Sequence, residues 1–153
     1  AAIELVSPFF SYATNTGKKL VKTIREELFK AVATSDLSGL IFTYVWYFDV
    51  PSDRTYLEEL TSIFKEKGAD VIYVELEADL EKRIERNKTE YRLEQKPTKR
   101  DVEWSETELK NSHEHHRLNS LAGEIEEEHY LRIDNINLSA QEVAERIKTT
   151  FNL

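Results

Sequence analysis

The segment "LIFTYVWYFDVPSDRTYLEELTSIFKEKGADVIYVEL", residues 40–76, decides the fold class. Its first nine residues, 40–48, are mostly β-branched or aromatic and show no polar alternation, which is typical of a strand buried on both faces. A break with possible helix N-caps and then helical spacing of apolar residues follow, up to Gly68. A second mostly apolar run at residues 70–76 completes a strand–helix–strand unit. Such a unit predicts two parallel strands in one sheet.

Upstream of this unit, residues 17–39 have the pattern of an amphipathic helix. Apolar side chains recur at a four-residue spacing, with Lys, Arg and Glu between them, at Leu20, Ile24, Leu28 and Val32. This spacing places the four side chains on one face of a helix.

Downstream, helix and strand patterns continue to alternate. Residues 78–87 have helical spacing, and residues 129–134, "HYLRID", read as a third strand. Two capping boxes predict helix starts. They are Ser105 with Glu108, which would open a polar helix to about residue 121, and Ser139 with Glu142. We therefore expect one α/β domain over residues 1–153, built as a three-layer αβα sandwich around a parallel sheet.

Charge is distributed unevenly along the chain. The net charge is −8, yet residues 82–100 hold eight Lys or Arg against three Glu and so carry +5, leaving −13 elsewhere. General nucleic-acid binding needs a broad positive surface, which this distribution does not supply. A single basic strip fits a small polyanion better, so we expect no nucleic-acid partner.

The apolar runs are too short for a membrane span. The longest, around residues 40–48, falls far short of the roughly 18 residues that a spanning helix requires. The chain has no cysteine, which excludes a disulfide framework. No secretory leader is recognisable. We expect no membrane partner and a cytoplasmic location.

Three strands are few for a sheet covered on both faces. The sequence also contains no methionine and begins with "AAIELV". Together these features lead us to expect one or more N-terminal strands before Ala1.

The pair Gly17-Lys18 is the one place where a phosphate-binding loop could be sought. A P-loop has the pattern G-x-x-x-x-G-K-[ST] between a strand and a helix, so that backbone N–H groups surround phosphate and a hydroxyl holds Mg²⁺. Here Tyr12 stands in place of the first glycine, and Lys19 stands in place of the hydroxyl residue. We interpret Gly17-Lys18 as an ordinary helix start.

The order of motifs after residue 70 nevertheless resembles the P-loop metabolite and nucleotide kinases, such as shikimate kinase. The similar features are the strand "VIYVEL", the helix "ADLEKRIERN", the basic stretch "KTEYRLEQKPTKRD" and the C-terminal "YLRIDNINLSAQEVAERI". The resemblance implies ATP-dependent phosphoryl transfer to a small metabolite or nucleoside, with Mg²⁺. It also implies that residues 86–103 form a mobile basic lid over the nucleotide, for which arginine's planar fork is suited.

The resemblance assigns roles to particular residues. Arg86 matches the arginine that stacks on adenine, and Arg92 matches the lid arginine that reaches the phosphates. Residues 135–138 match the loop on the adenine side, which makes Asn135 and Asn137 candidate nucleotide contacts. Lys96, Lys99 and Arg100 are weaker members of the same basic strip. An alternative for the basic residues is solvated charge paired with nearby glutamates, which contributes little energy. The alternative for residues 135–138 is a simple turn into a helix capped by Ser139.

Asp49 follows the first strand, where open α/β sheets bind ligands. It is a candidate catalytic residue that accepts a proton or orients Mg²⁺, and helix capping is the alternative. His113 and His116 have a spacing that can share a metal ion, but no third ligand is evident, and we expect no dedicated metal site. The rival to an enzyme is a non-catalytic module that binds a nucleotide or a protein on a degenerate kinase fold.

Overall fold

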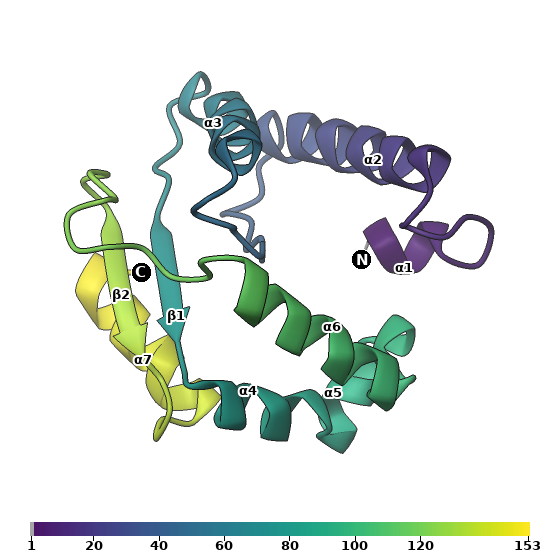
Figure 1. Ribbon diagram of the computed structural model, residues 1–153. Coiled ribbons are helices and arrows are strands. Elements are labelled where there is room, and N and C mark those ends of the chain that lie inside the picture. The colour runs from purple at the N-terminus through teal and green to yellow at the C-terminus, as the bar shows by residue number, and fades with distance from the viewer. Residues whose placement is uncertain (1) are drawn as a thin grey trace.

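The computed structural model describes residues 2–153, and these form a mixed α/β fold (Figure 1). The helices are α1 Ala2–Val6, α2 Asn15–Ala33, α3 Pro51–Lys65, α4 Leu80–Asn87, α5 Glu90–Gln95, the 3₁₀ helix η1 Pro97–Lys99, α6 Val102–His115 and α7 Ala140–Phe151. The strands are β1 Tyr73–Glu77 and β2 Tyr130–Asp134. None of the helices within residues 2–153 is long and apolar enough to cross a membrane.

The sheet consists of β1 and β2, which pair in parallel with Tyr73 opposite Tyr130 and Glu77 opposite Asp134. Both strands lie within three residues of where the sequence predicted them. Because the strands are parallel, their carboxyl ends meet at one edge, and α4 leaves β1 from that edge (Figure 1). The parallel pairing is confirmed, whereas the described residues form two paired strands rather than the sheet of a three-layer sandwich.

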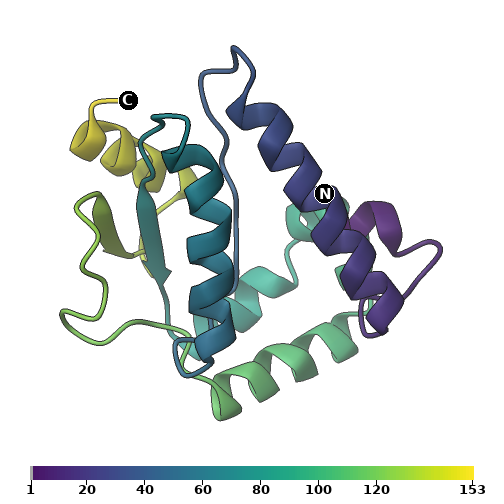
Figure 2. The ribbon, with the colours of Figure 1, turned by 90° about the horizontal axis from the view of Figure 1, so that it is seen from above.

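The two faces of the sheet differ in polarity. Side chains alternate between faces along a strand, so Tyr73 and Glu75 share one face while Ile133 lies on the other. The Tyr73 hydroxyl donates to Thr61 of α3 at 3.3 Å, which places the first face toward α3. α7 lies on the opposite side of the sheet (Figures 1 and 2), where Ile133 and Val143 are buried. The face toward α3 is therefore the polar one.

Residues 40–48, predicted as a buried strand, are extended but do not pair, so that prediction is wrong. No backbone hydrogen bond joins residues 39–46 to another part of the described chain. The alternating aromatic side chains pack against α2 and α3, as when the Phe42 ring lies 5.1 Å from that of Phe29. Ile41 on the other side is 95% exposed. The residue types favour a strand, but a ladder forms only where a second strand supplies donors and acceptors.

The predicted amphipathic helix is present as α2, but the face predicted for it is wrong. The buried residues of α2 are Gly17, Val21 and Phe29, whereas Leu20 and Leu28 are 37% and 48% exposed. α2 packs on α3, where the Phe29 ring lies 6.0 Å from that of Phe64.

The Gly17-Lys18 pair lies in the first turn of α2, as predicted. The Gly17 N–H donates to Oγ1 of the N-cap Thr14 at 3.1 Å. A Cβ at Gly17 would lie 2.2 Å from the Ser11 carbonyl oxygen, so close packing requires glycine here. This amide is used to cap its own helix.

The predicted lid is more ordered than expected. Residues 86–103 were expected to form a mobile lid, and they contain α5 and η1. The second half of this stretch contacts the N-terminal helix, because Thr98 donates to Glu4 through its hydroxyl at 2.6 Å. The predicted Ser105–Glu108 capping box is wrong. α6 begins at Val102 with Asp101 as its N-cap, and Ser105 is buried inside the helix. The capping box of Ser139 with Glu142 is confirmed.

Candidate functional site

A pocket of about 460 Å³ lies at the carboxyl edge of the sheet. Ligands of open α/β folds bind outside the carboxyl ends of parallel strands, and this volume falls in the range of small-molecule sites. Its walls come from β1, α4, the end of α6, the loop after α6 and the residues following β2. The lining residues are Glu77, Ala78, Asp79, Arg83, His113, His116, Arg117, Leu118, Asn119, Asp134 and Ile136.

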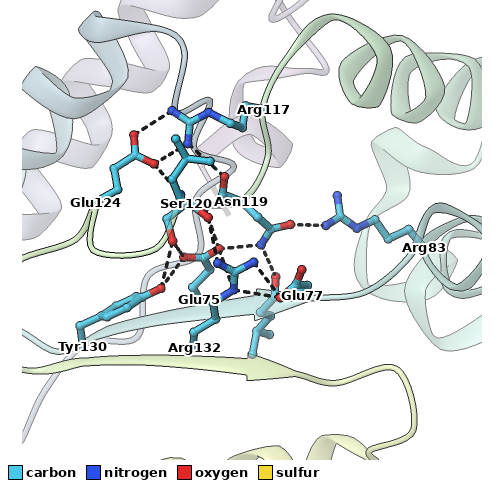
Figure 3. A network of polar contacts seen from close by, with 11 residues as sticks. Glu75, Glu77, Arg83, Arg117, Asn119, Ser120, Glu124, Tyr130 and Arg132 are labelled. Atoms are coloured by element: carbon cyan, nitrogen blue, oxygen red, sulfur yellow. Dashed lines mark hydrogen bonds and ion pairs between the residues drawn. The ribbon is translucent and has the colours of Figure 1, made fainter.

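Glu75 is the centre of the polar network beneath this pocket (Figure 3). Its side chain is 9% exposed. The carboxylate accepts hydrogen bonds from the Ser120 N–H at 3.0 Å, the Ser120 hydroxyl at 2.7 Å, the Tyr130 hydroxyl at 2.7 Å and the Asn119 amide at 2.7 Å. Burial acts to raise the pKa of Glu75, but these donors outweigh it, and the net effect lowers the pKa. Glu75 is therefore ionised at neutral pH.

Arg132 of β2 supplies the positive charge on the same face. Its Nε lies 3.7 Å from Glu75 and 2.9 Å from Oε2 of Glu77, and its Nη1 donates to the Ser120 carbonyl at 2.8 Å. The cross-strand pairs Glu75–Arg132 and Glu77–Asp134 are set by the register of the sheet. The network thus fixes the loop at Asn119 and Ser120 onto the sheet (Figure 3).

Two arginines of the pocket are held by this network. Arg83 of α4 donates through Nη2 to Oδ1 of Asn119 at 2.7 Å, and the Asn119 amide donates in turn to Glu75. Arg117 is paired with Glu124, with Nη2 donating to Oε1 at 2.7 Å (Figure 3). The hydrogen bond from Arg117 lowers the pKa of Glu124 to about 2. Both guanidinium groups are held by neighbouring groups in the pocket wall.

Asp49 lies beside the same pocket, where it contacts the end of α6. Its Oδ2 is 3.0 Å from Nδ1 of His116, and its Oδ1 accepts the Arg117 N–H at 2.8 Å. The Arg117 N–H, followed by the contact with His116, lowers the pKa of Asp49. Asp53, rather than Asp49, accepts the Tyr47 N–H at 2.9 Å near the start of α3. Asp49 is therefore in contact with residues 116–117, which are far from it in the sequence.

Arg86 contacts the predicted adenine-side loop directly. Its Nη1 donates to Oδ1 of Asn135 at 2.9 Å, and its Nη2 donates to the carbonyls of Asn135 at 2.6 Å and Ile136 at 3.3 Å. Two predicted site residues, Arg86 and Asn135, are thus brought together from α4 and the end of β2. Asn137 is exposed on the same loop. In this arrangement the Arg86 guanidinium holds the loop of residues 135–138 in place.

Arg92 lies away from the pocket, beyond the far end of α4. Its Nε donates to Oδ1 of Asn87 at 3.0 Å, and the buried Asn87 also contacts Ser105 of α6 at 3.0 Å. These contacts join α4, α5 and α6. The structure does not bring Arg92 together with Asp49, the other predicted catalytic residue, since Asp49 contacts the opposite end of α6 (Figure 1).

Lys96, Lys99 and Arg100 also lie outside the pocket at the strand edge. The Lys99 amine is 4.8 Å from the centre of the Trp104 ring. Burial, and then the charge of Arg92, lower the pKa of Lys99. Arg100 donates to the Leu93 carbonyl at 3.2 Å and borders a second, more open pocket of about 410 Å³. These residues form a separate basic surface.

The histidines do not form part of a metal-binding cluster among the described residues. Within residues 2–153, no group of three or more His, Cys, Asp or Glu side chains is arranged to hold a metal ion. His113 and His116 both line the pocket, but Nδ1 of His116 is occupied by Asp49. A Mg²⁺ site needs fewer protein ligands than such a cluster, because one or two carboxylates and substrate phosphates suffice to hold the ion.

Sequence reasoning missed Glu75, Arg117 and the contact of His116 with Asp49. A signal for Glu75 was present, since a glutamate inside the apolar run "VIYVEL" is rarely buried without partners. Arg132 inside "HYLRID" is the matching cross-strand charge. No local pattern marks Arg117, whose position depends on the loop after α6. No protein-family model, curated protein or solved structure matches the chain.

Proposed function

We propose that the protein is a small-molecule kinase that transfers a phosphoryl group from ATP to a hydroxyl of a small metabolite or nucleoside. The observation that carries the proposal is the pocket at the carboxyl edge of the parallel strands, lined by Arg83 and Arg117. Phosphoryl transfer requires positioned positive charge next to the phosphate oxygens and exclusion of water. Arg83, which is held by Asn119, meets the first requirement. Arg117 lies in the same wall, with its Nη groups engaged by Glu124 and by the Asn119 and Phe48 carbonyls.

The pocket arginines are suited to phosphate because they are fixed before a ligand arrives. Arg83 uses Nη2 for Asn119, which leaves its remaining N–H groups for an anion. The Nη groups of Arg117 donate to Glu124 and to the Asn119 and Phe48 carbonyls, which leaves its Nε–H for a ligand. A ligand held by preset charges loses less entropy on binding than one that must order flexible lysines. This favours the strand edge over the basic strip as the phosphate site.

The adenine would lie next to residues 135–138 in this proposal. Arg86 holds Asn135 and Ile136 in place, and Ile136 lines the pocket. Asn137 is exposed beside them and offers an amide to a base. The pocket and the loop therefore provide adjoining places for phosphate and base.

Asp134 fits the role of a magnesium ligand. It lines the pocket at the end of β2, and its Oδ1 accepts the Ile136 N–H at 3.0 Å. Its Oδ2 has no partner within residues 2–153. One carboxylate oxygen together with phosphates is a common arrangement for Mg²⁺, which supplies charge neutralisation during phosphoryl transfer. Asp49 fits this role less well, because both of its oxygens are already engaged.

The fold expected of such a kinase is a three-layer sandwich, and we include it in the proposal. Residues 40–46 and β1 run in the same direction on either side of α3 (Figure 2). The backbone groups of residues 40–46 have no backbone partners within the described chain. One further strand between residues 40–46 and β1 would supply hydrogen-bond partners to the backbone of both and extend the parallel sheet.

A non-catalytic nucleotide-binding module is the second candidate. The observation that favours it is the use of the Gly17 amide by Thr14, which leaves Gly17-Lys18 without the geometry of a phosphate loop. Residues 1–153 also contain no other Gly-Lys pair. Such a module would bind ATP at the strand edge without consuming it.

Isothermal titration with Mg-ATP and an assay of ADP formation with a panel of hydroxyl metabolites and nucleosides separate the two candidates. A kinase binds Mg-ATP and forms ADP in the presence of one class of acceptor. A module binds Mg-ATP and forms no ADP. Absence of Mg-ATP binding by the folded wild-type chain would contradict both.

A further inference from the structure

The Asp49–His116 pair has the arrangement of a proton acceptor with a positioning carboxylate. Nδ1 of His116 lies 3.0 Å from Oδ2 of Asp49. The imidazole also stacks on the Tyr47 ring, with ring centres 4.2 Å apart and planes inclined by 20°. The Tyr47 hydroxyl is itself 3.0 Å from the Ser112 hydroxyl of α6. The ring is therefore oriented by a carboxylate at one edge and by an aromatic ring on one face.

The carboxylate selects which nitrogen of His116 carries the proton. Asp49 is ionised at neutral pH, because the Arg117 N–H and the His116 contact lower its pKa. An ionised carboxylate accepts hydrogen bonds only, so Nδ1 is the donor in this contact. A neutral imidazole that carries its proton on Nδ1 has a lone pair on Nε2. Nε2 has no hydrogen-bond partner within residues 2–153, and the ring lines the pocket.

The titratable and charged groups around His116 are of both signs. The charged or titratable groups that share the pocket are Arg83, Arg117, His113, Glu77, Asp79 and Asp134. Arg117 is adjacent in sequence and is neutralised by Glu124. The loop that carries His116 is fixed to Asp49 through the Arg117 N–H. These contacts hold the imidazole in the same pocket as the two arginines.

We propose that His116 is the catalytic base of the phosphoryl transfer and that Asp49 is its positioning residue. The inference rests on the proposed function and names the group that receives the proton. The acceptor hydroxyl loses its proton to Nε2 of His116. The oxygen's electron pair forms the new bond to the γ-phosphorus of the nucleoside triphosphate. The bond from that phosphorus to the bridging oxygen breaks, and its electron pair leaves with the nucleoside diphosphate. The imidazolium next to Asp49 then returns the proton to solvent.

The assignment differs from the sequence-based prediction for Asp49. The sequence made Asp49 itself a candidate proton acceptor. With both carboxylate oxygens engaged, Asp49 is better placed to orient and stabilise an imidazolium. This is the division of roles expected when a carboxylate contacts Nδ1 of a catalytic histidine.

The first test is kinetic and compares His116→Gln with His115→Gln. His115 is the matched control because it lies one residue away, contacts only the Asn111 carbonyl among the described residues and does not line the pocket. We expect His116→Gln to lower kcat by on the order of 10²-fold, the usual contribution of a general base, with little change in the affinity for Mg-ATP. Added imidazole should restore part of the rate of a His116→Gly variant. His115→Gln should retain the wild-type rate.

The second test does not depend on turnover. Long-range ¹H–¹⁵N NMR of the ring nitrogens should show the proton of neutral His116 on Nδ1, and Asp49→Asn should remove this preference while the fold is kept. A proton on Nε2 would contradict the inference. Unchanged kcat in His116→Gln would also contradict it, while leaving the kinase function intact. A wild-type chain that binds Mg-ATP and transfers no phosphoryl group would contradict the kinase function, and the role of His116 as base with it.

Discussion

The strand-edge site and the basic segment, residues 86–103, both bear arginines but differ in how these are held. We use strand-edge site for the pocket at the ends of β1 and β2 and the Glu75 network beneath it. There, Arg83 and Arg117 both donate to Asn119, whose amide donates to the Glu75 carboxylate. In the basic segment, Arg92 is held by the neutral Asn87 at 3.0 Å, and Lys88 pairs with Glu106 at 2.5 Å. The number of basic residues in a stretch therefore does not indicate how firmly its arginines are held.

The largest expected difference between the regions is in stability. Glu75→Ala leaves the buried N–H of Ser120 and two hydroxyls without their acceptor and leaves Arg132 with less compensation. Removing one member of a buried charged network typically costs about 3 kcal/mol. Urea unfolding should show this loss, and Glu106→Ala, in the exposed pairs of the other region, should shift the midpoint much less. Equal shifts of the urea midpoint in Glu75→Ala and Glu106→Ala would show that the network does not stabilise the strand edge.

The next difference concerns affinity for the nucleotide. Arg83→Ala should weaken Mg-ATP binding by about tenfold, because a charge-assisted hydrogen bond to phosphate is worth roughly 1.5–3 kcal/mol. Arg92→Ala should change the affinity less, since Arg92 contacts Asn87 outside the pocket. Isothermal titration of both variants measures the contrast. If Arg92→Ala lost more affinity for Mg-ATP than Arg83→Ala, the phosphate site would lie in the basic segment instead.

Helix caps provide a control in which the two regions should behave alike. Asp79 caps α4 at the strand edge by accepting the Lys82 N–H at 2.7 Å, and Asp101 caps α6 by accepting the Trp104 N–H at 3.0 Å. Each substitution by alanine should lower the unfolding free energy by about 1 kcal/mol. A negligible effect of Asp101→Ala alone would indicate that the basic segment is not folded in solution as the structure describes.

The smallest expected effect depends on pH. The folded-state pKa of Glu124 is lowered from 4.5 to about 2 by Arg117. A lowered folded-state pKa contributes stability above pH 4.5, and that contribution is lost as the pH falls toward 2. The pair is partly exposed, so the contribution should stay below about 1 kcal/mol. The difference in unfolding free energy between wild type and Glu124→Gln should shrink over this window. A constant difference from pH 6 to pH 2 would contradict the pairing with Arg117.

Much of the fold was predictable because local patterns determine it. The helical periodicity of α2, the capping box of α7 and the apolar runs of β1 and β2 each depend on residues close in sequence. Which face of α2 is buried was not predicted, since Leu20 and Leu28 are exposed. Residues 40–48 show where this reasoning fails. Their composition favours a strand, but pairing depends on a second strand that no local pattern specifies. Ser105 illustrates a second failure, since its pattern with Glu108 fits a cap while Asp101 starts the helix four residues earlier.

The candidate site was less predictable than the fold. Arg86 and Asn135 were expected to lie at one nucleotide site, and they are in contact. The meeting of Asp49 with His116 depends on how the loop after α6 returns to the end of residues 40–48, which the sequence does not reveal. Arg92 was expected over the phosphates because it matches the lid arginine of the similar kinases, whereas its position follows from the buried Asn87 that joins three helices.

The central claim is that the strand-edge site, rather than the basic segment, binds the nucleotide. The most direct measurement is a ¹H–¹⁵N correlation spectrum of the ¹⁵N-labelled chain titrated with Mg-ATP. We predict that the largest shifts fall on Arg83, Arg117, Asn119 and Ile136, which line the pocket. Shifts confined to residues 88–100, or no shifts in a folded protein, would contradict the claim.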